Sequence, residues 1–325
     1  MQYAEFGKTG VRVSRAAIGG HEYLPSGSSR GFNEDMALAV TRGYVGEGYG
    51  GEKRVAVLRA AFDLGINFFD VTIDSEKEAL GRNLRDNPPP YPIYIQTRPE
   101  GMCYGYDDGN VQMLDYAGLK AEVQRILELM GIERIDFFNI GILQRALDLN
   151  PDFLERVGEN LRRLKSEGLI GFAVADSFSG EKTYLEMVRS GVFDGVNLDF
   201  NIGERSALAA LLPEVRQAGM GIVFREAFMK AKLFRMGEEA GIADRALLAG
   251  IALKWVASNN PSTILAGVAT ADQLRSNIAY LDSGPMSEVE REVLSRIEAT
   301  AAFSEYRAEW TARFHPEPTN RETAS

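Results

Sequence analysis

The stretch INFFDVTIDSE (66–76) joins an apolar run to a group of acidic residues. Its beginning, around Phe68 and Phe69, has the continuous apolar character of a strand that is covered on both faces. Asp70, Asp74 and Glu76 follow at the point where this strand would end. Carboxylates beside a core are costly unless they have partners. The stretch therefore predicts a buried strand with a polar site at its end.

Apolar runs of the same kind recur along the chain, and helical patterns separate them. The predicted strands cover residues 15–19, 66–70, 93–97, 135–140, 170–175, 195–200, 221–224 and 263–267. Apolar residues at helical spacing predict helices within 119–131, 151–168, 251–260 and 271–281. Strands that alternate with helices in this way predict an α/β fold, a parallel sheet closed into a (β/α)8 TIM barrel.

Two segments lie outside the predicted barrel repeats. YAEFGKTGVRVS (3–14) predicts a small antiparallel hairpin that turns at 8–10. After residue 285 we expect a C-terminal helix and then a polar, disordered tail. The chain is thus predicted to have a barrel domain over 1–285 and an extension over 286–325 that packs on the same domain. Aromatic side chains of this extension are expected to pack in the interior rather than to cap the barrel mouth or contact another subunit: Phe303, Tyr306, Trp310 and Phe314.

The composition is that of a soluble globular protein, with 45% hydrophobic and 25% charged residues among 325. A formal net charge of −10 argues against nucleic acid as a partner, because that partner requires a basic surface. The single cysteine, Cys103, excludes a disulfide framework and a cysteine-based metal site within the chain. We find no signal-peptide pattern and no apolar segment long enough to cross a membrane. We expect a cytoplasmic protein; a homo-oligomer is compatible with the sequence but not indicated by it.

GEGYGG (46–51) matches the G-x-G-x-x-G pattern of dinucleotide-binding folds, and Asp70 follows at a suitable distance. Three features argue against that interpretation. No compact apolar strand leads directly into Gly46, a separate predicted strand precedes the motif, and Glu47 would repel a pyrophosphate. We therefore expect a flexible glycine loop here.

Polar residues follow nearly every predicted strand. In a (β/α)8 barrel the active site lies at the C-terminal ends of the strands. The residues at those ends are His21, Glu22, Tyr23, Asp70, Asp74, Arg98, Glu100, Asn139, Asp176, Ser177, Asn197, Asp199, Arg225, Glu226 and Gly267. Their carboxylates would suit a hard cation, but no ligand-spacing motif supports a metal site and we expect none.

Several segments resemble the aldo-keto reductase superfamily in order and spacing, from residue 6 to about 281. They are FGKTGVRVSRAAIGG (6–20), AFDLGINFFD (61–70), SEKEALGRNL (75–84), LKSEGLIGFAVADSFS (164–179), ALKWVAS (252–258) and ILAGVATADQLRSN (264–277). The resemblance implies carbonyl reduction with NADPH by a set of four residues. These are a tyrosine as general acid, a lysine that lowers its pKa, an aspartate that pairs with the lysine, and a histidine that orients the substrate.

Most of that set has no match in this chain. Asp70 matches the aspartate, whereas VTID (71–74) contains no tyrosine, and Arg98 and Asn139 stand where the family has lysine and histidine. We expect Arg98 to pair with Asp70 and to suit a substrate carboxylate or phosphate. The missing group is the proton donor, for which His21 and Tyr23 are the best-placed substitutes. Further options are Tyr44, Tyr49, Tyr104 and Tyr106.

The resemblance also implies a nicotinamide cofactor, NADP or NAD. Asp176 and Ser177 align with the residues that hold the nicotinamide amide, Asn197 aligns with a glutamine of the same site, and Arg225 aligns with the group that stacks under nicotinamide. Lys230 is a candidate for the pyrophosphate. The adenine-binding pattern is matched by Gly267, Gln273 and Asn277. The loop GVATAD (267–272) lacks the Lys or Arg expected against a 2′-phosphate, so a preference for NADP does not follow.

The sequence leaves three interpretations open. The first is an oxidoreductase that binds NAD(P)(H) and acts on a small carbonyl or alcohol, anionic or sugar-like, with a non-standard proton donor and a degenerate tetrad. The second is a lyase, dehydratase or isomerase that uses Asp70, Arg98 and His21 without a redox step. The third is an inactive barrel that senses a nucleotide or binds another protein. We favour the first, because the match at Gly267, Gln273 and Asn277 has little reason to exist without a nucleotide.

Overall fold

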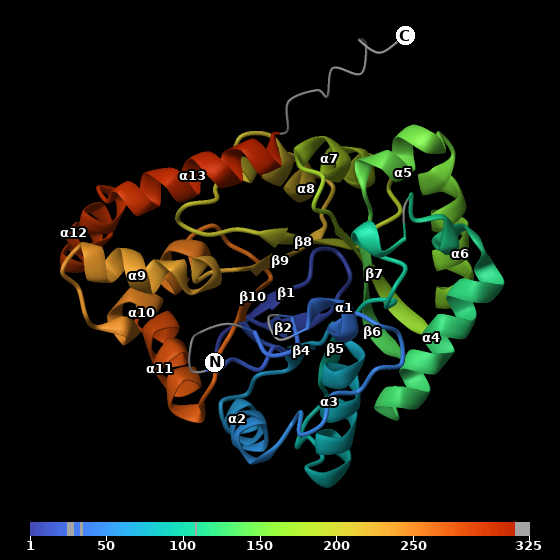
Figure 1. Cartoon of the computed structure of the whole chain (residues 1–325), viewed down its shortest axis with the longest axis horizontal. Helices are drawn as coiled ribbons and strands as arrows, with labels where there is room; N and C mark the ends of the chain where they lie inside the picture. The colour runs from blue at the N-terminus through green and yellow to red at the C-terminus, as the bar shows by residue number, and fades with distance from the viewer. Residues whose placement is uncertain (25–28, 33–34, 108, 316–325) are drawn as a thin grey trace.

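The computed structural model describes residues 1–24, 29–32, 35–107 and 109–315. Within them, eight parallel strands form a closed barrel with helices around it (Figure 1), which confirms the predicted fold. Each strand pairs with its neighbour in the sequence, and β10 closes the barrel on β3. The strands are β3 (Ala16–Gly19), β4 (Phe68–Asp70), β5 (Tyr94–Thr97), β6 (Ile135–Gly141), β7 (Ile170–Asp176), β8 (Gly195–Asp199), β9 (Gly221–Arg225) and β10 (Thr263–Ala266).

Helices follow the strands and cover the outside of the barrel, as the alternation of patterns predicts. The α-helices are α1 (Met36–Ala39), α2 (Glu52–Asp63), α3 (Asp74–Asp86), α4 (Tyr116–Met130), α5 (Gln144–Leu149), α6 (Phe153–Ser166), α7 (Glu181–Arg189), α8 (Leu211–Gln217), α9 (Lys232–Glu239), α10 (Arg245–Ala257), α11 (Ala271–Asp282), α12 (Glu288–Glu298) and α13 (Ala301–Phe314). Short 3-10 helices occur at η1 (Tyr104–Tyr106), η2 (Val111–Leu114), η3 (Ser206–Leu208) and η4 (Met229–Ala231). No helix in this part of the chain is both long and apolar enough to span a membrane.

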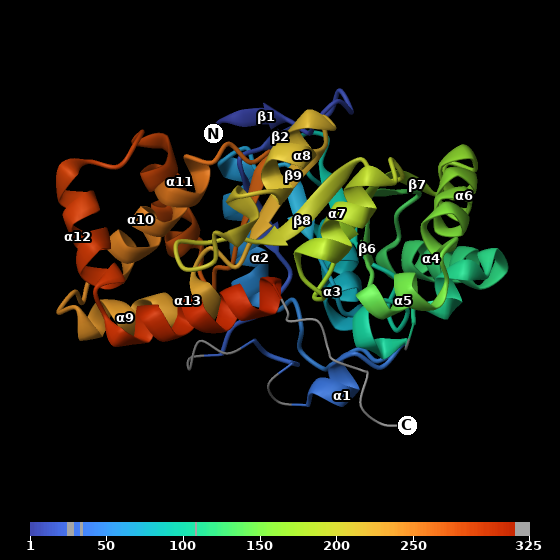
Figure 2. The same ribbon diagram turned by 90° about the horizontal axis from the view of Figure 1, so that it is seen from above.

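The predicted hairpin is present as β1 (Tyr3–Glu5) and β2 (Arg12–Ser14). It closes the N-terminal end of the barrel, at the opposite end of the molecule from α1 (Figure 2). Phe6 from its turn enters the barrel interior, where its ring centroid lies 4.4 Å from that of Phe137. A side chain at Gly195 would meet the ring of Phe6 at 2.6 Å. The barrel floor is therefore a packed aromatic core, which leaves chemistry to the opposite end.

The strand that contains Asp70 is shorter than predicted, because β4 begins at Phe68. The side chain of Asn67 binds the hairpin. Its Oδ1 accepts from the Ser14 amide at 2.7 Å, and its Nδ2 donates to the Arg12 carbonyl at 3.0 Å. This attachment holds the start of the strand to β2. It also fixes the position of Asp70 at the C-terminal end of this strand.

The GEGYGG stretch belongs to the long connection between β3 and α2, and β3 ends at Gly19, far ahead of Gly46. The Gly46 amide donates to Ser75 Oγ at 2.7 Å. Gly50 has a φ of +72°, and a side chain there would meet Ala79 Cβ at 2.6 Å. The glycines therefore permit close packing on α3, and the strand-to-helix geometry of a dinucleotide fingerprint is absent around them.

The C-terminal extension forms two helices rather than the expected single one, because Thr300 accepts from the Phe303 amide and starts α13. Phe303, Tyr306 and Trp310 are buried in a core cluster with residues of α9 and α10, which confirms interior packing for these three. Phe314 is partly buried. The expected disordered tail lies, from residue 316 on, outside the described residues.

Candidate active site

Two polar clusters lie where the barrel strands end. One is centred on Asp176 at the end of β7, and the other on His21, Asp70 and Glu76 after β3 and β4. Within the described residues, no three His, Cys, Asp or Glu side chains are grouped so that they could hold a metal ion.

Asp176 is fully buried and accepts hydrogen bonds from five neighbouring elements, with its Oδ1 accepting from the Tyr184 hydroxyl of α7 at 3.0 Å. Its Oδ2 accepts from Tyr104 at 2.5 Å and from the Nδ2 atoms of Asn139 and Asn197 at 3.2 Å each. Arg225 Nη1 donates to the same oxygen. The strand order explains the convergence, because β7 lies between β6 and β8, with Asp176 paired to Gly141 of β6 and Ala175 paired to Val196 of β8. The predicted residues Asn139, Asp176, Asn197 and Arg225 thus form one cluster.

Three polar atoms of this cluster remain without a hydrogen-bond partner among the described residues. They are Asn139 Oδ1, Asn197 Oδ1 and Arg225 Nη2, all buried. Leaving such atoms unpaired costs free energy. Each belongs to a side chain whose other polar atoms are fixed, since both amide nitrogens donate to Asp176 and Arg225 Nε donates to Asp199 Oδ1 at 2.5 Å. The cluster therefore offers two acceptors and one donor to a ligand.

Tyr104 belongs to η1, after β5, and reaches Asp176 from a backbone with a φ of +51°. Its hydroxyl donates to the carboxylate, and burial together with the charge of Asp176 raises the pKa of Tyr104 well above its usual value. A tyrosine in this position keeps its proton and uses it in the hydrogen bond to Asp176. It is a poor proton donor to a substrate.

His21 forms a close pair with Glu76 in the second cluster. His21 Nδ1 lies 2.6 Å from Glu76 Oε1, and the imidazole side chain is 35% exposed whereas that of Glu76 is 1% exposed. The other Glu76 oxygen accepts from the amide and hydroxyl of Thr72, at 2.9 and 3.0 Å. A side chain at Gly20 would meet Glu76 Oε2 at 2.7 Å. The glutamate is thus fixed from three sides, and it orients the imidazole.

His21 and Glu76 also shift each other's pKa. Partial burial opposes the charged imidazole, but the Glu76 charge and hydrogen bond raise the pKa of His21 above 6.5. Burial alone would raise the pKa of Glu76, yet the charge of His21 and the bonds from His21 and Thr72 lower it to about 2. The pairing therefore favours the imidazolium form of His21 beside an ionised carboxylate. Such a histidine can donate a proton.

Asp70 lies beside this pair. Burial raises the pKa of Asp70 to about 6, against the hydrogen bond that its Oδ1 accepts from Gln96 Nε2 at 2.8 Å. The expected pairing of Asp70 with Arg98 is wrong: among the described residues, Arg98 makes no ion pair with Asp70. Its Nη2 lies 4.0 Å from Glu100, and its guanidinium lies 5.1 Å from the centroid of the Tyr104 ring. The chain turns after β5 and directs Arg98 toward its own loop.

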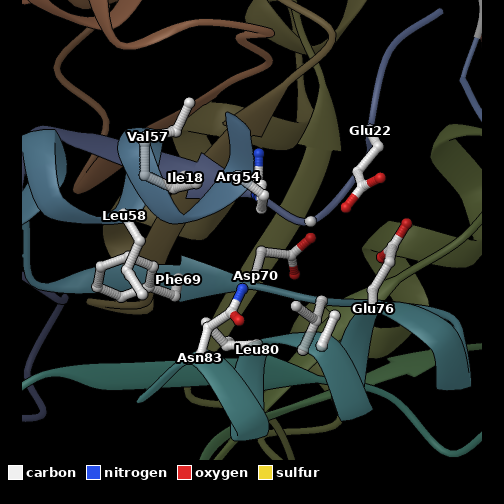
Figure 3. Close-up of a pocket in the computed structure, with 13 residues that line it drawn as sticks. Ile18, Glu22, Arg54, Val57, Leu58, Phe69, Asp70, Glu76, Leu80 and Asn83 are labelled. Atoms are coloured by element: carbon white, nitrogen blue, oxygen red, sulfur yellow. The ribbon is translucent and has the colours of Figure 1, made fainter. Parts of the chain in front are cut away.

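A small cavity of about 30 Å³ lies between β3, β4 and the helices α2 and α3 (Figure 3). Asp70, Glu76, Glu22 and Arg54 line its polar side, and the carboxyl groups face the same hollow (Figure 3). The volume is enough for about one water molecule with several polar partners. Burial lowers the pKa of Arg54, while Glu76 and Glu22 oppose this change. The cavity belongs to the electrostatic surroundings of Asp70 and Glu76.

Tyr23, the second predicted proton donor, lies over Gly267 at the end of β10, where a side chain on the glycine would overlap its ring. It is half-exposed, and partial burial with the charge of Glu226 raises its pKa. Tyr23 and Gly267 are thus neighbours at the junction of β10 and β3. Of the two predicted donors, only His21 is paired with a carboxylate, Glu76, that favours its protonated form.

The remaining predicted cofactor residues lie around this end of the barrel. Ser177 Oγ accepts from the Ser179 amide at 2.9 Å. Lys230 is exposed, with Nζ 5.1 Å from the ring centroid of Trp310 in α13. Gln273 Oε1 accepts from the Ala269 amide at 2.8 Å, and Asn277 is buried on the same helix, α11. Gln273 therefore closes its own loop through this oxygen.

Asp74, the second aspartate of the opening stretch, has a structural role. It is fully buried and pairs with Arg125 at 2.7 Å and Lys77 at 3.1 Å, and its Oδ2 accepts from the Gly43 amide at 2.7 Å. Lys77 is also fully buried and lies 3.6 Å from Glu100. Lys77 and Arg125, with the Gly43 bond, hold the pKa of Asp74 below its usual value, against burial. This ion network attaches the β3–α2 loop to α3 and α4.

The sequence did not identify Glu76 and Arg54 as site residues. Glu76 stands six positions after Asp70 in the stretch that predicts the site. The signal that could have found it is the pairing of this acid with His21, one of the two histidines of the chain. Arg54 follows the glycine loop at the start of α2 and carries no such signal.

Comparisons with known proteins agree with this geometry. The model of the aldo/keto reductase family matches residues 40–192. L-galactose dehydrogenase from Arabidopsis thaliana is 26% identical over 324 residues, covering 90% of this chain and 92% of that protein. Both comparisons show that the chain is similar to the aldo-keto reductase superfamily. These similarities support an aldo-keto reductase-like oxidoreductase.

The solved structures show the same fold. An aldo-keto reductase from Bacillus halodurans superposes with a TM-score of 0.67 in its holo form and 0.63 in its apo form. The identities are 17% and 16%, and in each case 94% of this chain and 99% of the other are covered. At this identity the likeness establishes the barrel and its connections.

Proposed function

We propose that this protein is an NAD(P)(H)-dependent oxidoreductase that interconverts a small, sugar-like carbonyl and alcohol, with His21 as the proton donor in place of the family's tyrosine. The observation that carries the proposal is the His21–Glu76 pair at 2.6 Å, which favours the protonated form of a partly exposed imidazole beside Asp70. Of the family's four catalytic residues only Asp70 is retained. With this degenerate tetrad, carbonyl reduction needs another proton donor, and His21 can supply the proton.

The cluster around Asp176 fits the nicotinamide end of such a cofactor. A primary carboxamide has two N–H donors and one carbonyl acceptor. These complement the two unpaired amide oxygens of Asn139 and Asn197 and the unpaired Nη2 of Arg225. The three residues belong to one hydrogen-bonded cluster, so one ligand group can satisfy all of them. Lys230, Gln273 and Asn277 remain candidates for the rest of the nucleotide, and either NAD or NADP is compatible with the loop 267–272.

When bound, a nicotinamide cofactor supplies or accepts the hydride. The residues of this chain then transfer the proton and hold the substrate in position. In the reducing direction, the His21 imidazolium gives its proton to the oxygen of the former carbonyl and becomes neutral; in the oxidising direction, the neutral imidazole takes it back. Glu76 stays ionised, because its pKa is about 2. Its role is to orient His21 and to stabilise the charged form.

The name of the Arabidopsis relative supports the proposed substrate class, since that protein is a dehydrogenase of L-galactose. The free, buried thiol of Cys103 suits a reducing compartment. The proposal therefore includes a cytoplasmic enzyme with a polar small-molecule substrate.

One observation favours a second candidate function. Asp70, with a pKa of about 6, lies beside His21, whose pKa is raised, and can act as a base while His21 acts as an acid. An isomerase or lyase needs only these two groups. Turnover of sugar acids or aldoses without any nicotinamide would support it.

Nucleotide binding tests the first proposal. We expect NADH or NADPH to bind wild-type protein at micromolar concentration, followed by nucleotide fluorescence. Replacing Asn139 and Asn197 together by leucine removes both acceptors and should weaken binding about tenfold or more. Asn160→Leu is the matched control, because Asn160 is also buried but donates to the Met113 carbonyl in another part of the fold. Failure of both nucleotides to bind at millimolar concentration would contradict the proposal.

A further inference from the structure

Phe178 is a large apolar side chain that stays exposed beside the candidate active site. It follows the end of β7 by two positions and is 56% exposed. Its neighbour Asp176 is the centre of the polar cluster. Ligand sites combine apolar and aromatic surface with a few polar groups, and the Phe178 ring next to this cluster provides that combination.

The ring is held in a fixed orientation by two residues of the cluster. The Tyr104 ring stacks on it with a centroid distance of 4.3 Å and an interplanar angle of 29°. The Arg225 guanidinium carbon lies 5.1 Å from its centroid. Tyr104 and Arg225 both donate to Asp176, so the buried carboxylate positions the supports of the exposed ring. A ligand that stacks on Phe178 therefore meets a surface that is already ordered.

The groups near this ring suit a ligand with hydroxyls at its edge and an apolar face. Asp199 pairs with Arg225 and is partly exposed, and Glu226 follows Arg225 at a backbone φ of +61°. Burial and the charge of Asp199 raise the pKa of Glu226. Carboxyl groups bind hydroxyls, whereas the Phe178 ring binds the C–H face of a ring compound. An open-chain polyol presents no such flat face.

We infer that Phe178 is a stacking platform for the substrate, and that the site takes polyhydroxylated ring compounds, cyclic sugars, in preference to open-chain polyols. The inference deepens the proposed function, since it assigns a substrate form to the same site. Phe178 is a specificity-determining residue in this account. It takes no part in proton transfer.

Equilibrium binding of a locked ring and of an open chain tests this directly, because neither probe needs turnover or cofactor. We would titrate ¹⁵N-labelled full-length protein with methyl β-D-galactopyranoside, which cannot open, and with galactitol, following NMR chemical shifts. We expect the wild type to bind the ring about tenfold more tightly. Phe178→Ala should abolish the preference and Phe178→Tyr should restore it. Leu149→Ala removes an equally exposed side chain from α5, 55% exposed, and should change nothing.

Two outcomes would overturn the inference. The first is a ring preference that is absent in the wild type or that persists in Phe178→Ala. The second is a loss of NAD(P)H affinity in Phe178→Ala, which would assign the platform to the cofactor. A wild type that binds the pyranoside with the expected preference but no nicotinamide would refute the proposed redox function and leave the platform intact.

Discussion

Replacing Glu76 by glutamine tests whether the carboxylate charge, and not only its shape, holds His21. The amide keeps the size of the side chain and can still accept from Thr72, so the substitution removes mainly the charge. A hydrogen bond to a charged group contributes about 1.5–3 kcal/mol and a neutral one about 0.5–1.5 kcal/mol. The difference is about 1–2 kcal/mol. Because His21 is 35% exposed, we expect the lower part of that range.

The loss of unfolding free energy in Glu76→Gln should depend on pH. The pKa of His21 is raised above 6.5 in the folded protein, so its contribution is fully present below pH 6.5 and is lost as the pH rises through the folded-state pKa. The pKa of Glu76 is lowered from 4.5 to about 2, so its contribution is present above pH 4.5 and is lost as the pH falls through about 2. The pair therefore stabilises the fold most between pH 4.5 and 6.5.

Urea unfolding of wild type and Glu76→Gln at several pH values measures this. We expect the difference in unfolding free energy to be about 1 kcal/mol inside that window and to shrink at pH values well above it. Glu78→Gln is the matched control on the same helix, α3: Glu78 pairs with Arg82 at 2.6 Å, but both side chains are partly exposed. It should change stability by less than about 0.5 kcal/mol at any pH. A loss in Glu76→Gln that does not vary with pH would refute the charge argument.

Two further substitutions test the surroundings of this pair. Gly20→Ala should place a methyl group 2.7 Å from Glu76 Oε2 and 3.1 Å from the Asp70 carbonyl. We expect this crowding to lower the unfolding free energy by about 1–3 kcal/mol and to weaken the pH dependence just described. A variant with the wild-type denaturation midpoint would contradict this. Asp74→Ala should cost about 3–5 kcal/mol in urea unfolding, because it leaves the fully buried Lys77 and the partly buried Arg125 without their shared partner. A loss below about 1 kcal/mol would show that the ion network does not stabilise the fold.

The barrel could be predicted because each strand is a short apolar run and each helix has its own periodicity. Parallel pairing then places the C-terminal parts of neighbouring strands side by side, and Asn139, Asp176 and Asn197 lie in one cluster there. Local sequence patterns are enough for features of this kind. They placed the hairpin and the buried aromatic residues of α13 as well.

Side chains on loops and helix starts could not be placed in this way. Arg98 follows the last residue of β5, and the turn after it, not the strand register, directs it to Glu100 rather than Asp70. Asp74 and Glu76 stand two positions apart at the start of α3, yet Asp74 faces Arg125 on α4 and Glu76 faces His21. Which partner each acid finds depends on contacts between segments far apart in the sequence.

The most direct test of the account is the rate of a single turnover of carbonyl reduction, measured by stopped flow with NAD(P)H already bound to wild type and to His21→Gln. The account predicts that the wild-type rate falls as the pH rises through the folded-state pKa of His21. The variant should bind the nucleotide with wild-type affinity but react about 10²–10⁴-fold more slowly, without that pH dependence. A His21→Gln variant that keeps the wild-type rate and pH profile would contradict the assignment of His21 as the proton donor.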